Sequence, residues 1–179
     1  LAYCAALVVY QLGGLITGEV GFNLFTIVDA NNDGSTWEYN APNGVAYCTF
    51  SSMQASDDWL ITPEIHLTPG RKYNFSFSAR RGMTSYLQQI GASFGEGLDP
   101  STYTEIVPRT NLPENEWVNL KTTVTVKADG ENHFGLHDQS PVDGYRPYVD
   151  SLLVIAGPLL SYPDTFTDLT IFPRDYGVG

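Results

Sequence analysis

The stretch that decides the fold is KYNFSFSAR at residues 72–80, where polar and apolar side chains alternate without interruption. Successive side chains of a β-strand point to opposite faces of the sheet, so this strand has one apolar and one polar face. The stretch VNLKTTVTVK at residues 118–127 alternates in the same way, and residues 90–94 repeat the pattern. Such strands are typical of antiparallel sheets with one face on a core and the other in water.

Turn-forming sequences separate these strands at short intervals. Pro42-Asn43-Gly44, Thr68-Pro69-Gly70 and Asp143-Gly144 combine residues that favour tight turns. Residues 59–61 and 152–155 are short apolar runs that we interpret as strands buried on both sides, and no long stretch carries a helical apolar stripe. The pattern predicts an all-β fold, a sandwich or a jelly roll built from antiparallel sheets.

The charge balance of the chain is acidic. Twenty Asp and Glu residues outnumber 9 Lys and Arg residues, which gives a formal net charge of −11. A nucleic-acid-binding protein needs clustered positive charge to displace counterions from phosphates. The basic residues cluster only as Arg71-Lys72 and Arg80-Arg81, so we exclude nucleic acids and anionic membrane surfaces as partners.

The N-terminal residues 1–16 are apolar but too short to cross a membrane. Gln11 and Gly13-Gly14 interrupt them before they reach a span of ~20 residues. We interpret them as a strand followed by a turn, with a truncated signal or pro-segment as the alternative. Cys4 and Cys48 lack redox or zinc spacing, and in an exported protein they could form one disulfide.

A domain boundary is predicted near Gly157-Pro158. Residues 1–157 are long enough for one domain with a sizeable core, and the proline-containing residues 158–164 read as a linker. The stretch FTDLTIFP at residues 166–173 has the character of a strand that opens a further module. We therefore expect residues 158–179 to hold a linker and the first strand of an incomplete second module.

The loop DANNDG at residues 29–34 is the strongest candidate for a metal site. It places oxygen-bearing side chains at alternate positions, Asp29, Asn31 and Asp33, and follows them with Gly34, which permits a tight bend around a hard cation. The loop has no bidentate Glu at its twelfth position, so further ligands must come from elsewhere, and the candidates are backbone carbonyls, Asp58 and Asp150. The alternative is an ion-free turn, because Asn, Asp and Gly favour turns on their own account.

Residues that could carry catalysis do not form a recognisable active site in the sequence. Asp57 and Asp58 are neighbours, and neighbours in a strand point to opposite faces, which disfavours a shared substrate. His133 and His137 share a face of a strand but lie about 13 Å apart along it, too far for one zinc ion. We therefore favour a structural role for all four, with a hydrolase using Asp57, Asp58 and a histidine as the less favoured hypothesis.

Tyrosines near predicted loops could contact a ligand. Tyr86, Tyr103, Tyr145 and Tyr148 offer flat apolar rings with a polar tip, which suits stacking against sugars. The alternative is that they cap the edges of the sandwich, and the sequence does not separate the two interpretations.

Five segments, in order, resemble one known family. They are residues 25–37 (FTIVDANNDGSTW), 57–65 (DDWLITPEI), 73–77 (YNFSF), 134–137 (FGLH) and 148–152 (YVDSL). Together they are similar to the cleaved-adhesin or "choice-of-anchor J" modules found in surface proteins of Bacteroidetes, including the adhesin regions of gingipain-type proteases. The resemblance covers about residues 22–157, and its most specific part is DDWLITP. Residues 1–21 depart from the family pattern, which usually opens with a strand containing Pro-Tyr.

The resemblance implies a jelly-roll β-sandwich similar to galactose-binding and MAM domains, commonly with structural Ca²⁺. It assigns Asp29, Asn31 and Asp33 to the ion, with Asp58 and Asp150 as further ligands. It also implies that the tail from Phe166 begins a domain of fibronectin-III or immunoglobulin type.

The same resemblance implies a functional class. We expect a non-catalytic module of a larger secreted or cell-surface protein that binds a host protein or a glycan, and neither an enzyme nor a membrane-spanning protein. The alternative hypothesis is an accessory domain that targets a secreted peptidase or glycoside hydrolase to its substrate. Fold similarity raises the expectation of a glycan ligand without establishing it.

Overall fold

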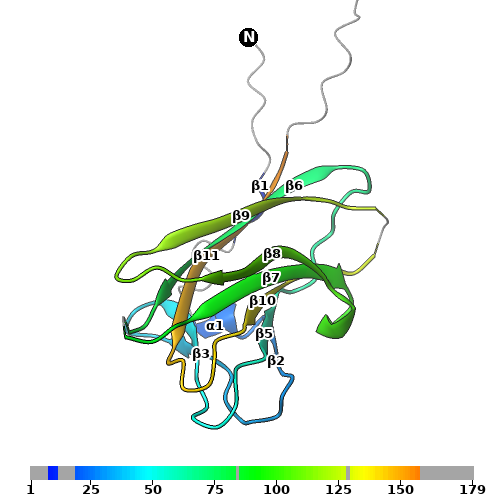
Figure 1. Ribbon diagram of the computed structural model, residues 1–179. Helices are drawn as coiled ribbons and strands as arrows, with labels where there is room; N and C mark the ends of the chain where they lie inside the picture. Colours follow the sequence, from blue (N-terminus) through cyan, green and yellow to red (C-terminus); the bar gives the residue numbers. More distant parts are fainter. Residues whose placement is uncertain (1–7, 12–18, 84, 128–129, 158–179) are drawn as a thin grey trace, which may run out of the picture.

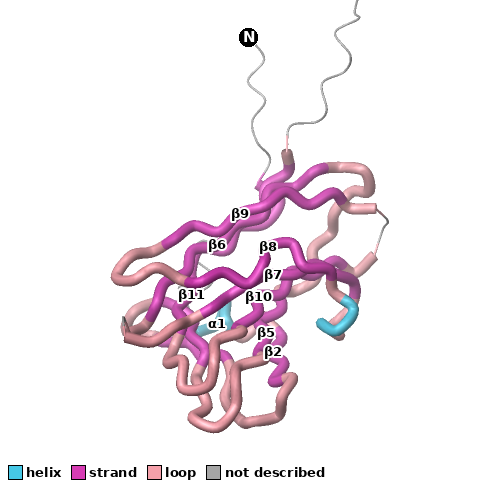
Figure 2. Tube along the Cα trace, viewed as in Figure 1, coloured by secondary structure: helices cyan, strands magenta, loops and turns pink. Residues whose placement is uncertain are grey.

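Two antiparallel β-sheets face each other across an apolar interior in the computed structural model (Figure 1), which describes residues 8–11, 19–83, 85–127 and 130–157. The predicted all-β, jelly-roll β-sandwich is therefore confirmed. Helical structure in the described residues is confined to the four-residue α1 (Glu19–Phe22), which the sequence did not predict, and a 3₁₀ turn, η1 (Pro100–Thr102) (Figure 2). No helix among the described residues has the length and apolar character needed to cross a membrane.

The first sheet has the strand order β3-β4-β11-β6-β9, with β1 also paired to β11. Its strands are β1 (Val8–Gln11), β3 (Trp37–Asn40), β4 (Val45–Cys48), β6 (Lys72–Arg81), β9 (Val118–Thr125) and β11 (Pro147–Ala156). Strand β11 pairs with β4 near its beginning, at Tyr148 and Val149, and with β1 near its end, at residues 153–155. The long strand β11 thus pairs with both of the short strands β4 and β1.

The second sheet has the strand order β2-β5-β10-β7-β8. Its strands are β2 (Thr26–Asp29), β5 (Asp58–Ile61), β7 (Gln89–Glu96), β8 (Thr104–Asn111) and β10 (Asn132–Asp138). The central pairs β5–β10 and β10–β7 join strands that are not consecutive in the chain. The reason is that the chain changes sheet after β1, β2, β4, β5, β6, β8, β9 and β10. This crossing brings distant segments together on each outer face.

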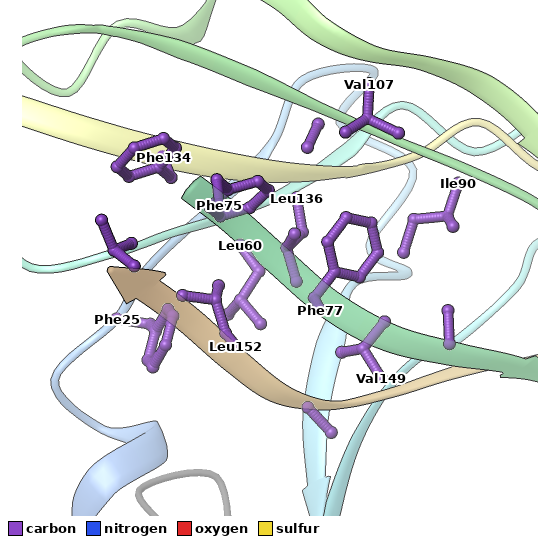
Figure 3. Close-up of a cluster of buried hydrophobic side chains, with 14 of the residues drawn as sticks. Phe25, Leu60, Phe75, Phe77, Ile90, Val107, Phe134, Leu136, Val149 and Leu152 are labelled. Atoms are coloured by element: carbon purple, nitrogen blue, oxygen red, sulfur yellow. The ribbon is translucent and has the colours of Figure 1, made fainter. Parts of the chain in front are cut away.

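The core follows the predicted alternation. Tyr73, Phe75, Phe77 and Ala79 of β6 are all at most 2% exposed. Phe75 stacks on Phe134 of the opposite sheet with ring centroids 4.5 Å apart, and the labelled side chains of both sheets interdigitate between them (Figure 3). Fully burying one such aromatic side chain contributes roughly 1.5–3 kcal/mol, so these positions fix which face of each strand points inward.

Two expectations fall on residues outside the described part of the chain. Residues 158–179, predicted as linker and further strand, are not described, and neither is Cys4. Cys48 lies fully buried in β4 as a free thiol. The structure therefore does not bear out a Cys4–Cys48 disulfide, and the boundary after Gly157 remains a prediction.

Candidate functional site on the outer face of the five-stranded sheet

Aromatic rings gather on the outer face of the β2-β5-β10-β7-β8 sheet. Trp59 of β5 lies opposite His137 of β10 in the strand register, and the two rings stack with centroids 3.7 Å apart. The outward position of Trp59 follows from the alternation in β5, since its neighbour Leu60 points into the core. Asp57, just before β5, holds the imidazole in place through a 2.7 Å contact between its Oδ1 and His137 Nε2.

A third ring, Tyr103, comes from the loop after η1. Asp99 caps this 3₁₀ turn by accepting a hydrogen bond from the Ser101 N–H. Tyr103 meets Trp59 edge to face at 6.2 Å, and its hydroxyl donates to the Gly97 carbonyl at 2.5 Å. We call the three rings Trp59, Tyr103 and His137 the aromatic site.

Two glycines let these rings lie against the sheet. A Cβ atom on Gly95 of β7 would sit 2.2 Å from the Tyr103 ring, and one on Gly135 of β10 would sit 2.9 Å from the Trp59 ring. Contacts that short do not occur, so any larger residue would displace the rings. Glycine inside a strand often marks a place where another group approaches the backbone closely, as the rings do here.

A hollow of about 450 Å³ opens beside the aromatic site. Its volume lies in the range of small-ligand pockets, ~300–1,000 Å³. The hollow is lined by Val28, Ala30, Asp57, Trp59, Ser93, Asp99, Pro100, Ser101, Tyr103 and Glu105. Aromatic surface is thus surrounded by carboxylates and hydroxyls, which are the groups that stack against a sugar ring and hydrogen-bond its hydroxyls.

Burial controls the ionisation of the site. It lowers the pKa of His137 below its usual 6.5, although the Asp57 carboxylate opposes this shift. Burial also raises the pKa of the Tyr103 hydroxyl to about 12, with the nearby Asp99 adding to the rise. Near neutral pH both rings are therefore uncharged, and the negative charge of the site resides on the surrounding carboxylates.

The predicted metal loop at residues 29–34 closes on its own hydrogen bonds. The Asp29 carboxylate accepts from the Asp33 and Gly34 N–H groups, at 3.2 and 2.9 Å. The Asn31 side-chain amide donates to the Ala55 carbonyl at 2.8 Å and to Asp33 Oδ2 at 3.2 Å. The loop therefore has the Asp-and-Asn turn chemistry that the sequence suggested, and it is tied to the segment before β5.

Asp58 lies in the interior next to this loop. It is the register partner of Asp29 on β2 and of Asp138 on β10, and all three residues face the inner side of the sheet. Asp58 is fully buried, and neither of its carboxylate oxygens has a hydrogen-bond partner among the described residues. Burial first, and then the charges of Asp138, Asp29 and Asp33, raise its pKa to about 7.

Asp138 is a buried acid that sequence analysis missed. Burial raises its pKa to about 6, and its Oδ1 accepts a 2.5 Å hydrogen bond from the Ser140 hydroxyl, while Oδ2 has no partner among the described residues. The alternation in β10 could have predicted this burial. Phe134 and Leu136 point inward, and Asp138, two residues farther along the strand, faces the same side.

The structure does not place Asp150 with the other predicted ligands. Asp150 belongs to β11 in the opposite sheet, where it pairs with Ser78 and accepts from the Ser151 N–H. Asp29, Asp33 and Asp58 lie close together, but no three His, Cys, Asp or Glu side chains of the described residues are arranged to hold a metal ion. The Ca²⁺ site therefore stays a prediction.

Of the four tyrosines considered from sequence, only Tyr103 lines the hollow. Tyr86 and Tyr145 stack on each other at 5.8 Å, and Tyr148 lies on β11 beside Tyr47. His133 is buried and contacts the Thr62 carbonyl through Nδ1, as expected of a packed residue. His137 differs from this expectation because its ring forms part of the aromatic site.

The comparisons with known proteins agree with this fold. A model of the carbohydrate binding domain family matches residues 26–134, more than half of the chain. The chain belongs to this family. A comparison with curated protein sequences found no match.

Solved structures with the same fold include adhesins and carbohydrate-binding modules. The K3 cleaved adhesin domain of Lys-gingipain from Porphyromonas gingivalis matches with a TM-score of 0.67 and 14% identity, over 86% of this chain and all of that chain. A CBM4 structure matches with a TM-score of 0.57 and 21% identity, over 74% and 86% of the two chains. A Clostridium thermocellum xylanase 10B structure with CBM22-1 and GH10 modules, in complex with xylohexaose, matches at 0.56 and 14%, over 86% of this chain and 29% of that chain.

Proposed function

We propose that this chain is a non-catalytic extracellular module that binds a glycan at the aromatic site. The observation that carries the proposal is the hollow of about 450 Å³ beside Trp59 and Tyr103, on the outer face of the sheet. Membership of the carbohydrate binding domain family supports it. A sugar ring has one face apolar enough to stack on an aromatic ring and hydroxyls that pair with carboxylates and serines.

The carboxylates of the hollow favour a neutral glycan. Asp57, Asp99 and Glu105 line it, so an anionic sugar would meet like charge at short range. The xylanase structure with xylohexaose supports a β-linked polysaccharide as the ligand class. We propose two settings for such a module: adhesion to host glycans or proteins by a surface protein, and substrate targeting for a secreted hydrolase that shares its polypeptide.

Binding to neutral polysaccharides tests the proposal. We expect xylan or another soluble β-glycan to retard the protein in affinity electrophoresis. Tyr103→Ala should weaken binding about fivefold or more, since stacking of this kind is worth ~1 kcal/mol or more. Tyr103→Phe keeps the ring and should retain most of the affinity, and Tyr86→Ala, away from the hollow, should change nothing. Retardation that Tyr103→Ala leaves intact would refute the location of the site.

The same module is proposed to have no hydrolytic activity. Asp57 and His137 form a hydrogen-bonded pair at the hollow, and this pair is the arrangement most open to a catalytic interpretation. We assign it instead to holding the imidazole against Trp59. Release of reducing sugars from a bound glycan, abolished by Asp57→Asn, would show that this assignment is wrong.

We further propose that Ca²⁺ binds between the residue 29–34 loop and Asp58. The support is the pair of buried, unpartnered Asp58 oxygens next to Asp29 and Asp33, because a cation would offset their mutual repulsion. Asp150, on the opposite sheet, is not included. The midpoint of thermal unfolding should rise with Ca²⁺ and fall with chelator. Asp58→Asn should abolish the difference and Asp150→Asn should keep it, whereas an unchanged wild-type midpoint would contradict the proposal.

A further inference from the structure

A continuous row of arginine and aromatic side chains crosses the outer face of the other sheet. Its members, in spatial order, are Trp117, Arg80, Tyr148, Tyr47, Arg146 and Tyr145. We call these six residues the arginine row. It lies on the sheet opposite the aromatic site, so its ligand would be separate from the glycan proposed above.

The strand register builds the row. Tyr148 of β11 lies directly between Tyr47 of β4 and Arg80 of β6, and all three occupy outward positions of their strands. Trp117 comes next, because the β6–β9 pairing ends with Ala79 opposite Val118 and Arg80 follows Ala79. The span from β4 to β9 is three strand spacings, or roughly 14 Å. The row is therefore long enough to contact several units of an extended polymer.

Each guanidinium is held between two rings. The Arg80 Cζ lies 5.2 Å from the Trp117 ring centroid and 5.0 Å from that of Tyr148. The Arg146 Cζ lies 5.1 Å from the Tyr47 centroid and 5.9 Å from that of Tyr145. Stacked guanidinium groups keep a fixed plane, and the N–H groups in that plane remain available to an acceptor.

Neither arginine has an acidic partner within the described residues. Arg80 and Arg146 form no ion pair and no hydrogen bond there, and the Nε of each is buried without an acceptor. This is unexpected in a chain of net charge −11, where carboxylates are abundant. The nearby acids are otherwise engaged: Glu38 accepts from the Tyr47 hydroxyl, and Asp150 accepts from the Ser151 N–H. The terminal N–H groups of two fixed guanidiniums are thus left for an external anion.

A polar hollow of about 520 Å³ lies on the same face farther along β6 and β9. Asn74, Ser76, Asn119, Lys121 and Thr123 line it. Their amides and hydroxyls suit neutral hydroxyl groups of a sugar chain, and Lys121 adds a further cation. An acidic peptide would use the arginines but offers little to this array of amides and hydroxyls, so the combination favours a polysaccharide.

We propose that the arginine row binds an acidic polysaccharide whose sugars carry carboxylates, such as a polyuronate. The carboxylates would pair with the Arg80 and Arg146 guanidiniums, and the sugar rings would contact the tyrosine and tryptophan faces. The module would then hold two chemically different glycans on its two outer faces.

Polygalacturonate is a direct probe, and its fully methyl-esterified form is the matched uncharged ligand. The acidic polymer should bind, and esterification should weaken binding ~10-fold or more, because charge-assisted pairs are lost. Arg80→Gln should weaken polygalacturonate binding by a similar factor. Lys72→Gln removes the same charge from the same face of β6, about 26 Å away, and should change affinity less than twofold. Absence of binding, or an equal loss in both variants, would overturn the proposal.

A second readout does not depend on the arginine variants folding. Trp117 is 43% exposed, whereas Trp37 and Trp59 are 2% and 8% exposed, so fluorescence changes on ligand binding at this face report Trp117. Polygalacturonate should shift wild-type emission and leave Trp117→Phe emission unchanged. Tyr103→Ala should keep the shift, which separates this site from the glycan site on the other face. A polyglutamate peptide that produces the same shift with equal affinity would overturn the polysaccharide assignment in favour of an acidic protein.

Discussion

The two outer faces of the sandwich use aromatic rings in opposite electrostatic settings. On the five-stranded sheet, Trp59 and Tyr103 are surrounded by carboxylates and lie against the sheet at Gly135 and Gly95. On the six-stranded sheet, each of two guanidinium groups lies between two rings and has no acidic partner among the described residues. The contrast teaches that the net charge of −11 does not predict the ligand of either face. Local charge around the rings decides it.

Replacing one tryptophan on each face with alanine is the test of this contrast with the largest expected effect. Trp59 is 8% exposed and stacks on His137, so Trp59→Ala should lower the free energy of unfolding by roughly 3–5 kcal/mol and abolish neutral glycan binding. Trp117→Ala removes a ring that is 43% exposed and should cost less than ~1 kcal/mol while weakening polyuronate binding. Urea denaturation and binding assays on both variants measure the four quantities. Equal losses of both ligands in both variants would remove the distinction between the faces.

The buried acids between the faces give the next largest effect. Burial raises the pKa of Asp58 from 3.8 to about 7 and that of Asp138 to about 6, so the folded protein binds protons that the unfolded chain releases. In chelator, the contribution of Asp58 and Asp138 to the free energy of unfolding should therefore be highest below pH 4. It should fall as the pH rises to about 7. The fall should amount to roughly 2–4 kcal/mol.

Asp58→Asn is the matched variant for this pH dependence. It removes the titration of Asp58, so the decline between pH 4 and 7 should shrink to the part contributed by Asp138, whose pKa burial raises to about 6. Denaturation curves across this range, for wild type and variant in the same chelating buffer, make the measurement. A wild-type stability that rises over the whole window would contradict the assigned pKa shifts.

A smaller effect concerns His137. Burial lowers its pKa below 6.5, so the unfolded chain takes up a proton before the folded protein does. The His137 contribution to stability is present above pH 6.5 and is lost as the pH falls through the lowered pKa. His137→Phe keeps a ring against Trp59 and removes this titration, which should make stability between pH 5 and 6.5 less pH-dependent by under ~1 kcal/mol. Comparing the unfolding of Asp58→Asn with that of the Asp58→Asn, His137→Phe double variant isolates the contribution of His137 to stability.

The strands were predictable from sequence because their signal is local. The alternation in residues 72–80 fixes which side chains of β6 enter the core, and the opposite orientations of Asp57 and Asp58 follow from the same rule. The residue 29–34 loop has the Asp-and-Asn turn that the sequence analysis gave as the alternative to a metal site, and its Ca²⁺ stays a prediction.

The binding faces were not predictable in the same way. Trp59, Tyr103 and His137 come from three segments that meet only because non-consecutive strands pair, and alternation within one strand carries no information about its neighbour. Gly95 and Gly135 have no side chain that would point to a binding site in the sequence, yet their lack of a Cβ atom leaves room for the Tyr103 and Trp59 rings. Asp150 was grouped with the loop acids, but its strand belongs to the other sheet. Arg80 and Arg146 lack any sequence motif, since their rings come from three separate segments, at Tyr47, at Trp117 and at residues 145–148.

The pairing of β1 with the end of β11 has a mechanical consequence. Val8, at the start of β1, lies opposite Ile155, near the end of β11, so the two ends of the described domain are side by side. Hydrogen bonds between antiparallel strands run perpendicular to the strands. A force that pulls Val8 away from Ile155 therefore loads these bonds one after another, as in opening a zip, instead of all at once. Strand β1 would detach at low force, while β11, which carries Tyr148 of the arginine row, keeps its longer pairing with β6.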